Sequence, residues 1–264
     1  MTQTRSRDAF GALLKDWRRR RRASQLDLAL GADVSARHVS FIETGRSQPS
    51  RAMVLRLAAE LDVPHAARNE WLTAAGYAEA YPARPLDAEE TKAARQAVAW
   101  MLERHDPFPA FALDRHWRIV SRNAACARLL GLFDVGEGDS IIDAFLDNRM
   151  LQEAVVNRAE IAAHTRSRLR AESARYGGDP VLDEAIGRLT RMLGDEAETL
   201  DGDAAFVPIR YRLGDLELSL FSSFSHFTSA RDVALAELRV EMMFPADDAT
   251  RARLLAAAGS TGRA

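Results

Sequence analysis

The spacing of hydrophobic residues changes along the chain. In the first third, apolar residues recur three and four positions apart, which is typical of amphipathic helices. Phe10, Leu13, Leu14 and Trp17 form one such stripe. The spacing predicts five short helices, over residues 6–20, 25–32, 36–44, 51–60 and 65–75.

From residue 105 onwards, stretches of alternating apolar and polar residues also occur, as expected of half-buried strands. They predict strands at 108–113, 117–120, 206–213, 216–222 and 232–244. The alternation slips within the last strand, so we expect a β-bulge near Ala236 and Glu237. Helices are predicted at 88–104, 124–130, 140–146, 150–176, 180–193 and 250–258. This order predicts an α+β domain: one antiparallel sheet with helices on one face.

The segment from Ser24 to Ser50 has the pattern of a helix-turn-helix. Ser24 and Ser35 are good N-caps for two short helices, and Gly45 suits the left-handed stop after the second. Leu26 and Ala29 are expected to face inward from the first helix, with Val39 and Ile42 from the second. Asp33 stands at a turn position where many such proteins carry Gly, but Asp tolerates the left-handed conformation.

The inward residues leave a defined outward face on the second helix, which enters the major groove in helix-turn-helix proteins. Arg37 suits guanine, and small or apolar side chains suit thymine methyl groups. The start of the first helix and the arginine run at 18–22 suit phosphates. The predicted DNA-binding residues are Gln25, Ser35, Ala36, Arg37, His38, Ser40, Phe41, Arg46, Arg19 and Arg22.

Blander interpretations stay open for parts of this surface. Phe41 is as well explained as a core residue, and a run of arginines is often only a solvated face. The whole region would then be a small helical domain without a nucleic-acid role. The complete series of caps, turn and stop favours DNA binding.

At these residues the chain resembles the Xre/Cro/C1-type regulators, also called lambda-repressor-like. The run from Trp17 to Tyr81 is similar to the subgroup that carries a C-terminal MmyB-like ligand-binding domain. The resemblance is strong over residues 5–81 and looser to about 250. It implies an all-α five-helix head followed by a PAS-like domain. The strand, turn, strand and Asn123-capped helix near the start of the second domain also resemble the opening of PAS domains.

The resemblance further implies that a small apolar, fatty-acid-like ligand binds between the sheet and its helices. Aromatic residues of the second domain are candidates to line that pocket, although such a residue is more often plain core. These candidates are Phe108, Phe111, Trp117, Phe145, Phe206 and Phe221.

Charge and composition favour a DNA-binding head on an acidic body. The net charge is −2, but residues 1–76 carry 13 basic and 8 acidic residues, a net of +5, which leaves −7 for the rest. No apolar run approaches the roughly 18 residues of a membrane span, and the N-terminus has no apolar signal region. We therefore expect a cytoplasmic protein without membrane contact.

Little in the sequence points to catalysis or to a bound metal. No nucleophile motif is present, and four histidines of the second domain are scattered without the spacing of metal ligands. The single cysteine, Cys126, lies in a predicted helix and is expected to be buried and inert. We predict no enzyme activity, no metal and no cofactor other than the apolar ligand.

These observations predict a homodimeric transcription regulator, because one short helix reads too few bases for genomic specificity. The expected operator is palindromic double-stranded DNA. The expected parts are a DNA-binding domain at 1–80, a linker and connecting helix at 81–104, a PAS-like domain at 105–250 and a flexible tail at 251–264. The alternative is a DNA-anchored interaction module whose PAS-like domain only dimerises or docks a partner.

Overall fold

The computed structural model describes the backbone of residues 2–194 and 206–261. The chain divides into two compact units, one formed mainly by residues to Ala83 and the other mainly by residues from Arg84. Each unit has its own hydrophobic core. No helix in the described part of the chain combines the length and apolar character that a membrane crossing requires.

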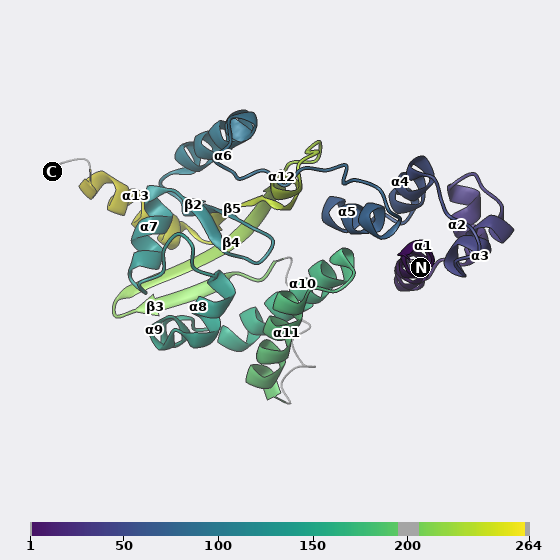
Figure 1. The fold of residues 1–264 in the computed structure, drawn as a ribbon. Coiled ribbons are helices and arrows are strands. Elements are labelled where there is room, and N and C mark those ends of the chain that lie inside the picture. Colours follow the sequence, from purple (N-terminus) through teal and green to yellow (C-terminus); the bar gives the residue numbers. More distant parts are fainter. Residues whose placement is uncertain (1, 195–205, 262–264) are drawn as a thin grey trace. The chain divides into compact units, whose positions relative to one another are not determined.

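The first unit is built from five helices, as the spacing predicts (Figure 1). Its core centres on Trp71, which is fully buried and meets Phe10 and Trp17 edge to face. Aromatic pairs in this geometry add stability beyond their buried area. The helices are α1 (Thr2–Arg20), α2 (Gln25–Gly31), α3 (Ala36–Glu43), α4 (Arg51–Glu60) and α5 (His65–Ala74).

One inward residue of α2 was predicted wrongly. Leu26 is 57% exposed, whereas Leu28 and Ala29 are buried. A helix of seven residues makes barely two turns, so its apolar residues do not define one face by their spacing alone. Leu30, which is also exposed, lies one turn after Leu26.

The backbones of α1 and α3 come unusually close at Gly11. A Cβ atom at this position would lie 2.7 Å from the carbonyl oxygens of both Ile42 and Glu43. These oxygens belong to the C-terminal end of α3 and cannot turn away as a flexible side chain would. Glycine at this position therefore sets how closely α1 supports α3.

The second unit contains a five-stranded antiparallel sheet in the order β2-β1-β5-β4-β3. The order of two strands, helices and three further strands agrees with the predicted α+β class. The first and last segments of the domain meet in the middle, where β1 pairs with β5. The strands are β1 (Ala110–Leu113), β2 (Ile119–Arg122), β3 (Ile209–Leu213), β4 (Leu216–His226) and β5 (Arg239–Pro245).

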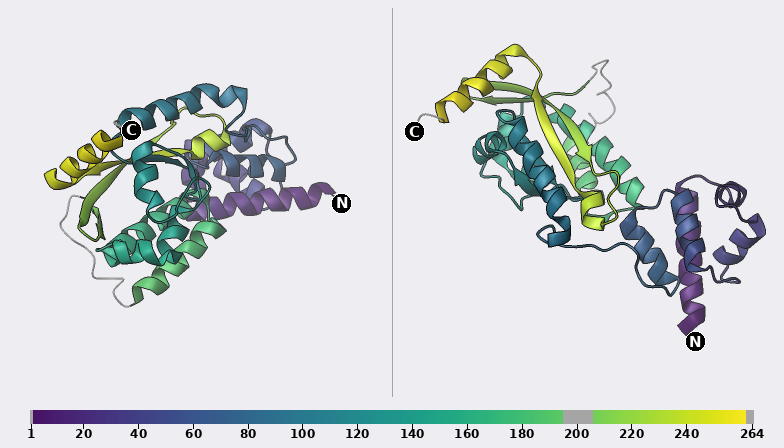
Figure 2. Two further views of the ribbon diagram at one scale, coloured as in Figure 1. Left: turned by 90° about the vertical axis from the view of Figure 1, so that its left-hand side faces the viewer. Right: turned by 90° about the horizontal axis from the view of Figure 1, so that it is seen from above.

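Helices cover both faces of this sheet, not one face as expected. A main core forms between helices α7–α11 and the face that carries Phe111, Leu220 and Met243, which we call the inner face. On the other, outer face, Val98 and Leu102 of α6 form a smaller core. Figures 1 and 2 show α6 and the group α8–α11 on opposite sides of the sheet. The bounds are η1 (Glu89–Thr91), α6 (Lys92–His105), α7 (Ala124–Gly131), α8 (Ile141–Asp147), α9 (Arg149–Ala154), α10 (Arg158–Tyr176) and α11 (Pro180–Leu193).

The long helix expected at 150–176 is in fact two helices, α9 and α10. Between them, Val155 forms a β-bridge with Tyr211, and the Val156 N–H donates to the Arg210 carbonyl. The Asn157 side chain donates to the Pro208 carbonyl and accepts from the Arg210 N–H. Pairing with the edge strand β3 therefore interrupts the helix, and no local sequence signal announces it.

The strand expected at 232–244 is also corrected. Its first half is a short helix, α12 (Val233–Glu237), and only Arg239–Pro245 forms a strand. The slip in alternation that suggested a β-bulge marks this change from helix to strand. The helix expected at 250–258 is confirmed as α13 (Asp248–Thr261), so most of the expected tail is helical, and the Thr250 hydroxyl accepts from the Ser219 N–H of β4. Residues 262–264 of the expected tail lie outside the described residues.

Candidate DNA-binding surface and ligand cavity

The caps and turn of the helix-turn-helix form as the sequence predicts. Ser24 and Asp27 make a reciprocal capping box, with hydrogen bonds of 3.0 and 2.8 Å between each side chain and the other's backbone N–H. The Ser35 hydroxyl accepts from the His38 N–H at the start of α3. Asp33 has a φ of +52° and Gly45 a φ of +71°, so both adopt the left-handed conformation. The entry and exit of α3 are thus fixed by local bonds.

A buried carboxylate at the end of α3 ties the three helices together. Glu43 accepts bonds from Arg18 of α1 at 2.6 and 3.0 Å and from the Gln25 amide of α2 at 2.7 Å. Burial alone would raise the pKa of Glu43, but the bonds from Arg18 and Gln25 and the Arg18 charge outweigh it, so the pKa is lowered. Gln25, predicted as a phosphate ligand, therefore has one amide hydrogen committed to Glu43 and one remaining.

The predicted base-reading residues share one face of α3. Arg37 is exposed, and its guanidinium carbon lies 5.1 Å from the centre of the Phe41 ring. Arg46, just after α3, is also exposed, and its guanidinium carbon lies 6.0 Å from the centre of the same ring. Phe41 is half-buried and sits outside the fully buried core of the head. Ala36, His38 and Ser40 are likewise partly accessible.

Some arginines of the run at 18–22 make contacts within the protein, and others do not. Arg18 binds Glu43, Arg20 binds Asp16 of its own helix, and Arg21 donates to the Leu61 carbonyl. Arg19 and Arg22 are exposed and have no such contact in the described part of the chain. These are the two arginines of the run that the sequence nominated for phosphate contact.

The inner face of the sheet encloses a cavity of about 430 Å³, which we call the inner cavity. Its size lies within the range of about 300–1,000 Å³ that is typical of small-ligand pockets. Phe111, Trp117 and Phe145 line its walls, with aliphatic residues from α7, α8 and α10.

The other predicted aromatics are placed differently. Phe206 and Phe221 border the inner cavity and stack on each other at 4.6 Å, and Phe221 also stacks on Phe244. Since Phe221 pairs with Phe244 in the sheet, its ring belongs to the outer face. Phe108 is absent from the lining, and its ring lies 5.9 Å from the His105 ring. Five of the six candidates therefore border the inner cavity, but the Phe221 ring lies on the opposite face of the sheet.

Two arginines pack against aromatic rings at or near the inner cavity, and one of them, Arg168, lines it. The Arg168 guanidinium carbon of α10 lies 3.5 Å from the centre of the Phe224 ring and 4.5 Å from that of Trp117. The Arg239 guanidinium lies 4.2 Å from the Trp117 ring. Such stacking fixes a planar guanidinium in place while its N–H groups remain directed sideways.

Burial shifts the pKa of three other groups that line the inner cavity, His164, Cys126 and Tyr211. Burial, then the Arg168 charge, lower the pKa of His164. Burial raises the pKa of the Cys126 thiol to about 12, and burial with nearby Glu241 raises that of Tyr211. The thiol is therefore protonated at neutral pH, as expected for an inert cysteine.

Sequence reasoning missed the polar residues of this cavity. Arg168 is one of several arginines on α10, and nothing local marks it as the one that faces inward. Glu241 carried a usable signal, because it is a charged residue between the apolar residues Val240 and Met242 of β5. Charges at such positions are rarely buried without a functional or pairing reason.

Comparisons with known proteins match both units. Residues 94–256 match the family described as the MmyB-like transcription regulator ligand binding domain, and residues 9–71 match a helix-turn-helix domain family. A stretch of 82 residues, 31% of this chain, is 35% identical to the uncharacterized HTH-type transcriptional regulator RghRB of Bacillus subtilis (strain 168). This stretch spans 57% of that protein.

Among solved structures, the chain is similar to one titled "Structure of an RNA-binding Light-Oxygen-Voltage Receptor". The likeness has 16% sequence identity and a TM-score of 0.25, and it covers 99% of this chain and 65% of that one. The chain thus spans less than two thirds of the length of either relative, and the structural likeness is too weak to support an argument.

Proposed function

Because this chain belongs to the MmyB-like transcription regulators, with a helix-turn-helix domain ahead of the ligand-binding domain, we propose that it is a homodimeric, ligand-controlled regulator in the cytoplasm. The head binds a palindromic operator, and a small apolar ligand with an acidic head group, such as a fatty acid, modulates that binding. The family is one of transcription regulators, in keeping with the expectation that the chain is not an enzyme.

DNA binding is supported by the exposed face of α3. Arg37 is exposed at the start of the helix. Arg46 shares the Phe41 ring with it, and Arg19 and Arg22 are exposed arginines without an ion pair among the described residues. Base contacts carry specificity and phosphate contacts carry affinity and salt dependence. A single α3 of eight residues reads few base pairs, so two heads on two half-sites are needed.

The ligand class is supported by Arg168 in the inner cavity. The walls are largely aromatic and aliphatic, which suits a hydrocarbon chain, and the Arg168 guanidinium, stacked on Phe224, lines the same cavity together with Glu241. A carboxylate forms its strongest hydrogen bonds with arginine, in water-excluded surroundings most of all.

The operator half of the proposal is tested by selecting a binding site from random duplexes and measuring fluorescence anisotropy. Arg37→Ala should weaken the selected site by about 1–3 kcal/mol and leave nonspecific DNA unchanged. Arg19→Ala should weaken all sequences alike and lower the salt slope by about one. If both variants lose affinity only in parallel, Arg37 is one more phosphate contact and the base-reading role is wrong.

The ligand half is tested by native mass spectrometry of the purified protein before and after organic extraction. The proposal is supported by a dimer that loses the mass of one fatty-acid molecule per chain on extraction and gains the mass of decanoate when decanoate is added. Arg168→Gln should weaken decanoate binding about tenfold or more, whereas Arg191→Gln on the exposed side of α11 should not. A dimer that carries and rebinds nothing favours the alternative, in which the domain only dimerises or docks a partner.

A further inference from the structure

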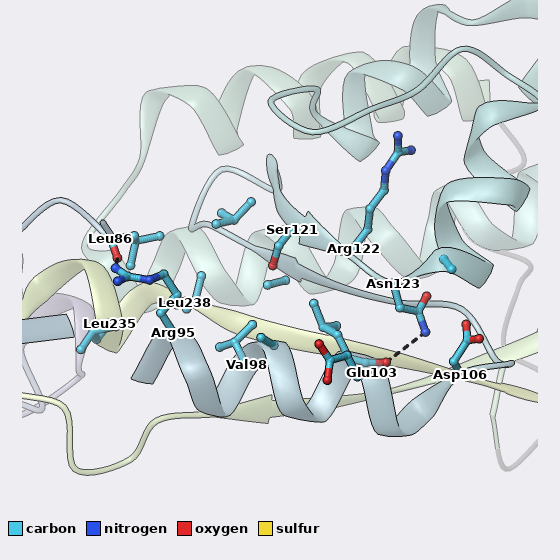
Figure 3. A pocket seen from close by; sticks show the side chains of 15 residues that line it. Leu86, Arg95, Val98, Glu103, Asp106, Ser121, Arg122, Asn123, Leu235 and Leu238 are labelled. Atoms are coloured by element: carbon cyan, nitrogen blue, oxygen red, sulfur yellow. Dashed lines mark hydrogen bonds between the residues drawn. The ribbon is translucent and has the colours of Figure 1, made fainter. Parts of the chain in front are cut away.

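On the basis of the homodimer proposed above, we further propose that its two subunits meet through the exposed side of α6, with the two helices antiparallel. Helix α6 lies on the outer face of the sheet, where its Val98 and Leu102 are buried. Figure 3 shows Val98 directed from the helix towards the strands. The opposite side of α6 is exposed along the length of the helix. This is the side that the second copy of the chain would cover.

The exposed side of α6 carries one large aromatic residue among small ones. Four exposed residues follow one another at spacings of four, three and four positions and form one stripe along the helix: Ala93, Ala97, Trp100 and Arg104. Trp100 is 59% exposed, and the Arg104 guanidinium carbon lies 5.6 Å from the centre of its ring. Tryptophan and arginine are enriched where protein surfaces meet and often dominate the binding energy there.

The stripe is complementary in shape to a second copy of itself. A symmetric dimer uses the same patch twice, so each side chain must find a suitable partner within that patch. If two α6 helices cross antiparallel near Ala97, Trp100 of one protomer lies over the partner's Ala93 and Ala97, whose small side chains leave room for the indole. A parallel pair would instead bring the two Trp100 rings to the same level and set alanine against alanine.

The charges beside the stripe favour the same antiparallel orientation. Lys92 and Glu103 are separated by close to three helical turns, so they share one flank of α6, about 16 Å apart. Lys92 has only an exposed ion pair with Glu89, at 2.9 Å, and the Glu103 carboxylate has no ion-pair partner among the described residues. An antiparallel crossing places each Lys92 beside the partner's Glu103. A parallel crossing would place like charges together, which is unfavourable.

The opposite flank is complementary as well. Arg104 stacks on Trp100 and makes no ion pair within the described part of the chain. In the same register it comes level with the partner's η1, which carries Glu89 and Glu90. Unlike charges therefore meet on both flanks of the crossing. Such complementarity sets orientation more than affinity, so most of the affinity is expected from the burial of Trp100.

The surface is tested by sedimentation velocity of the full chain over a concentration series. Trp100→Glu should raise the dissociation constant of the dimer about thirtyfold or more, with an unchanged melting curve as the check on folding. The control is Leu255→Glu, which changes an apolar residue of α13 that is 45% exposed and should leave the dimer unaffected. A parent protein that is monomeric throughout refutes the homodimer itself. A dimeric parent that Trp100→Glu does not weaken refutes only the assignment to α6.

Charge reversal tests the predicted ion pairs. Glu103→Lys should weaken the dimer about tenfold, and adding Lys92→Glu in the same chain should restore it, because the two reversed charges again face each other. General damage to the fold would not be repaired in this way. Glu184→Lys, at an exposed position of α11, is the matched control and should have no effect. Failure of the double variant to recover would overturn the pairing.

The orientation is tested by cross-linking the Lys92→Cys/Glu103→Cys double variant under mild oxidation. The two positions lie too far apart within one chain for a disulfide, which needs Cα atoms within about 7 Å, and the native Cys126 is buried. An antiparallel dimer should therefore become covalently linked in the double variant but not in Lys92→Cys alone. Efficient linking of Lys92→Cys alone would show a parallel arrangement and overturn the proposed orientation.

Discussion

Replacing Gly11 with alanine should destabilise the head, although the same change in most helices stabilises them. The normal gain is about 0.5–1 kcal/mol, because glycine loses more backbone freedom on folding. Here the new Cβ would stand 2.7 Å from two carbonyl oxygens of α3. Relieving such an overlap by moving a packed helix costs about 1–3 kcal/mol. The net expectation is a loss of about 1–2 kcal/mol.

The matched control is Gly187→Ala in α11, where the new Cβ would meet only the end of the Arg191 side chain at 3.6 Å. That variant should keep the ordinary gain. Thermal unfolding of both variants by circular dichroism tests the difference, and a loss of 1 kcal/mol in a domain of this size lowers the melting temperature by roughly 4–8 °C. Because Gly11 contacts α3, operator affinity should fall in the first variant only.

The reasoning is refuted if Gly11→Ala melts at or above the temperature of the parent protein and binds DNA equally well. That result would mean that α1 and α3 can separate by a few tenths of an ångström without cost. The close approach of α1 to α3 at Gly11 would then contribute nothing measurable to the stability of the head. A loss of stability with unchanged DNA affinity would instead confine the effect of Gly11 to folding.

Three further predictions concern stability and reactivity. The pKa of Glu43 is lower in the folded protein than its ordinary value of 4.5. The ionised carboxylate therefore stabilises the head fully above pH 4.5, and this stabilisation is lost as the pH falls through the pKa of the folded state. Glu43→Gln should flatten the acid side of a plot of the head's stability against pH. Asn123→Ala removes four buried hydrogen bonds and should lower the free energy of unfolding by about 2–4 kcal/mol, measured by urea titration, and a loss below about 1 kcal/mol would contradict the assigned role. The Cys126 thiol, whose pKa burial raises to about 12, should react with a disulfide reagent at pH 8 only after unfolding, and rapid reaction of the native protein would contradict its burial.

The head was largely predictable because its signals are local. Ser24, Ser35 and Gly45 each act on backbone groups within a few residues, so their effects can be read without knowing the fold. The prediction that Leu26 faces inward was wrong, because packing against neighbouring helices decides which face of a two-turn helix is buried. The Glu43 network also escaped prediction, since its members come from three helices that only tertiary packing brings together.

The second unit was predictable in its order of elements but not in its boundaries. The break at Val155 exists because β3 supplies a bonding partner, and β3 lies more than fifty residues later in the chain. The region before Arg239 changes from helix to strand without a glycine or proline to mark it. Aromatic residues of the inner cavity were found by composition, whereas Arg168 depended on knowing which face of α10 is inward.

The alternation of side chains along β1 has a practical consequence for engineering. Phe111 lines the inner cavity, whereas Ala112 lines a cavity between the outer face of the sheet and α6, and their partners in β5 are Glu241 and Val240. Side chains at odd positions of β1 and β5 thus point to one face of the sheet, and side chains at even positions point to the other. Substitutions at positions of one parity can therefore change the lining of one cavity without placing a new side chain in the other.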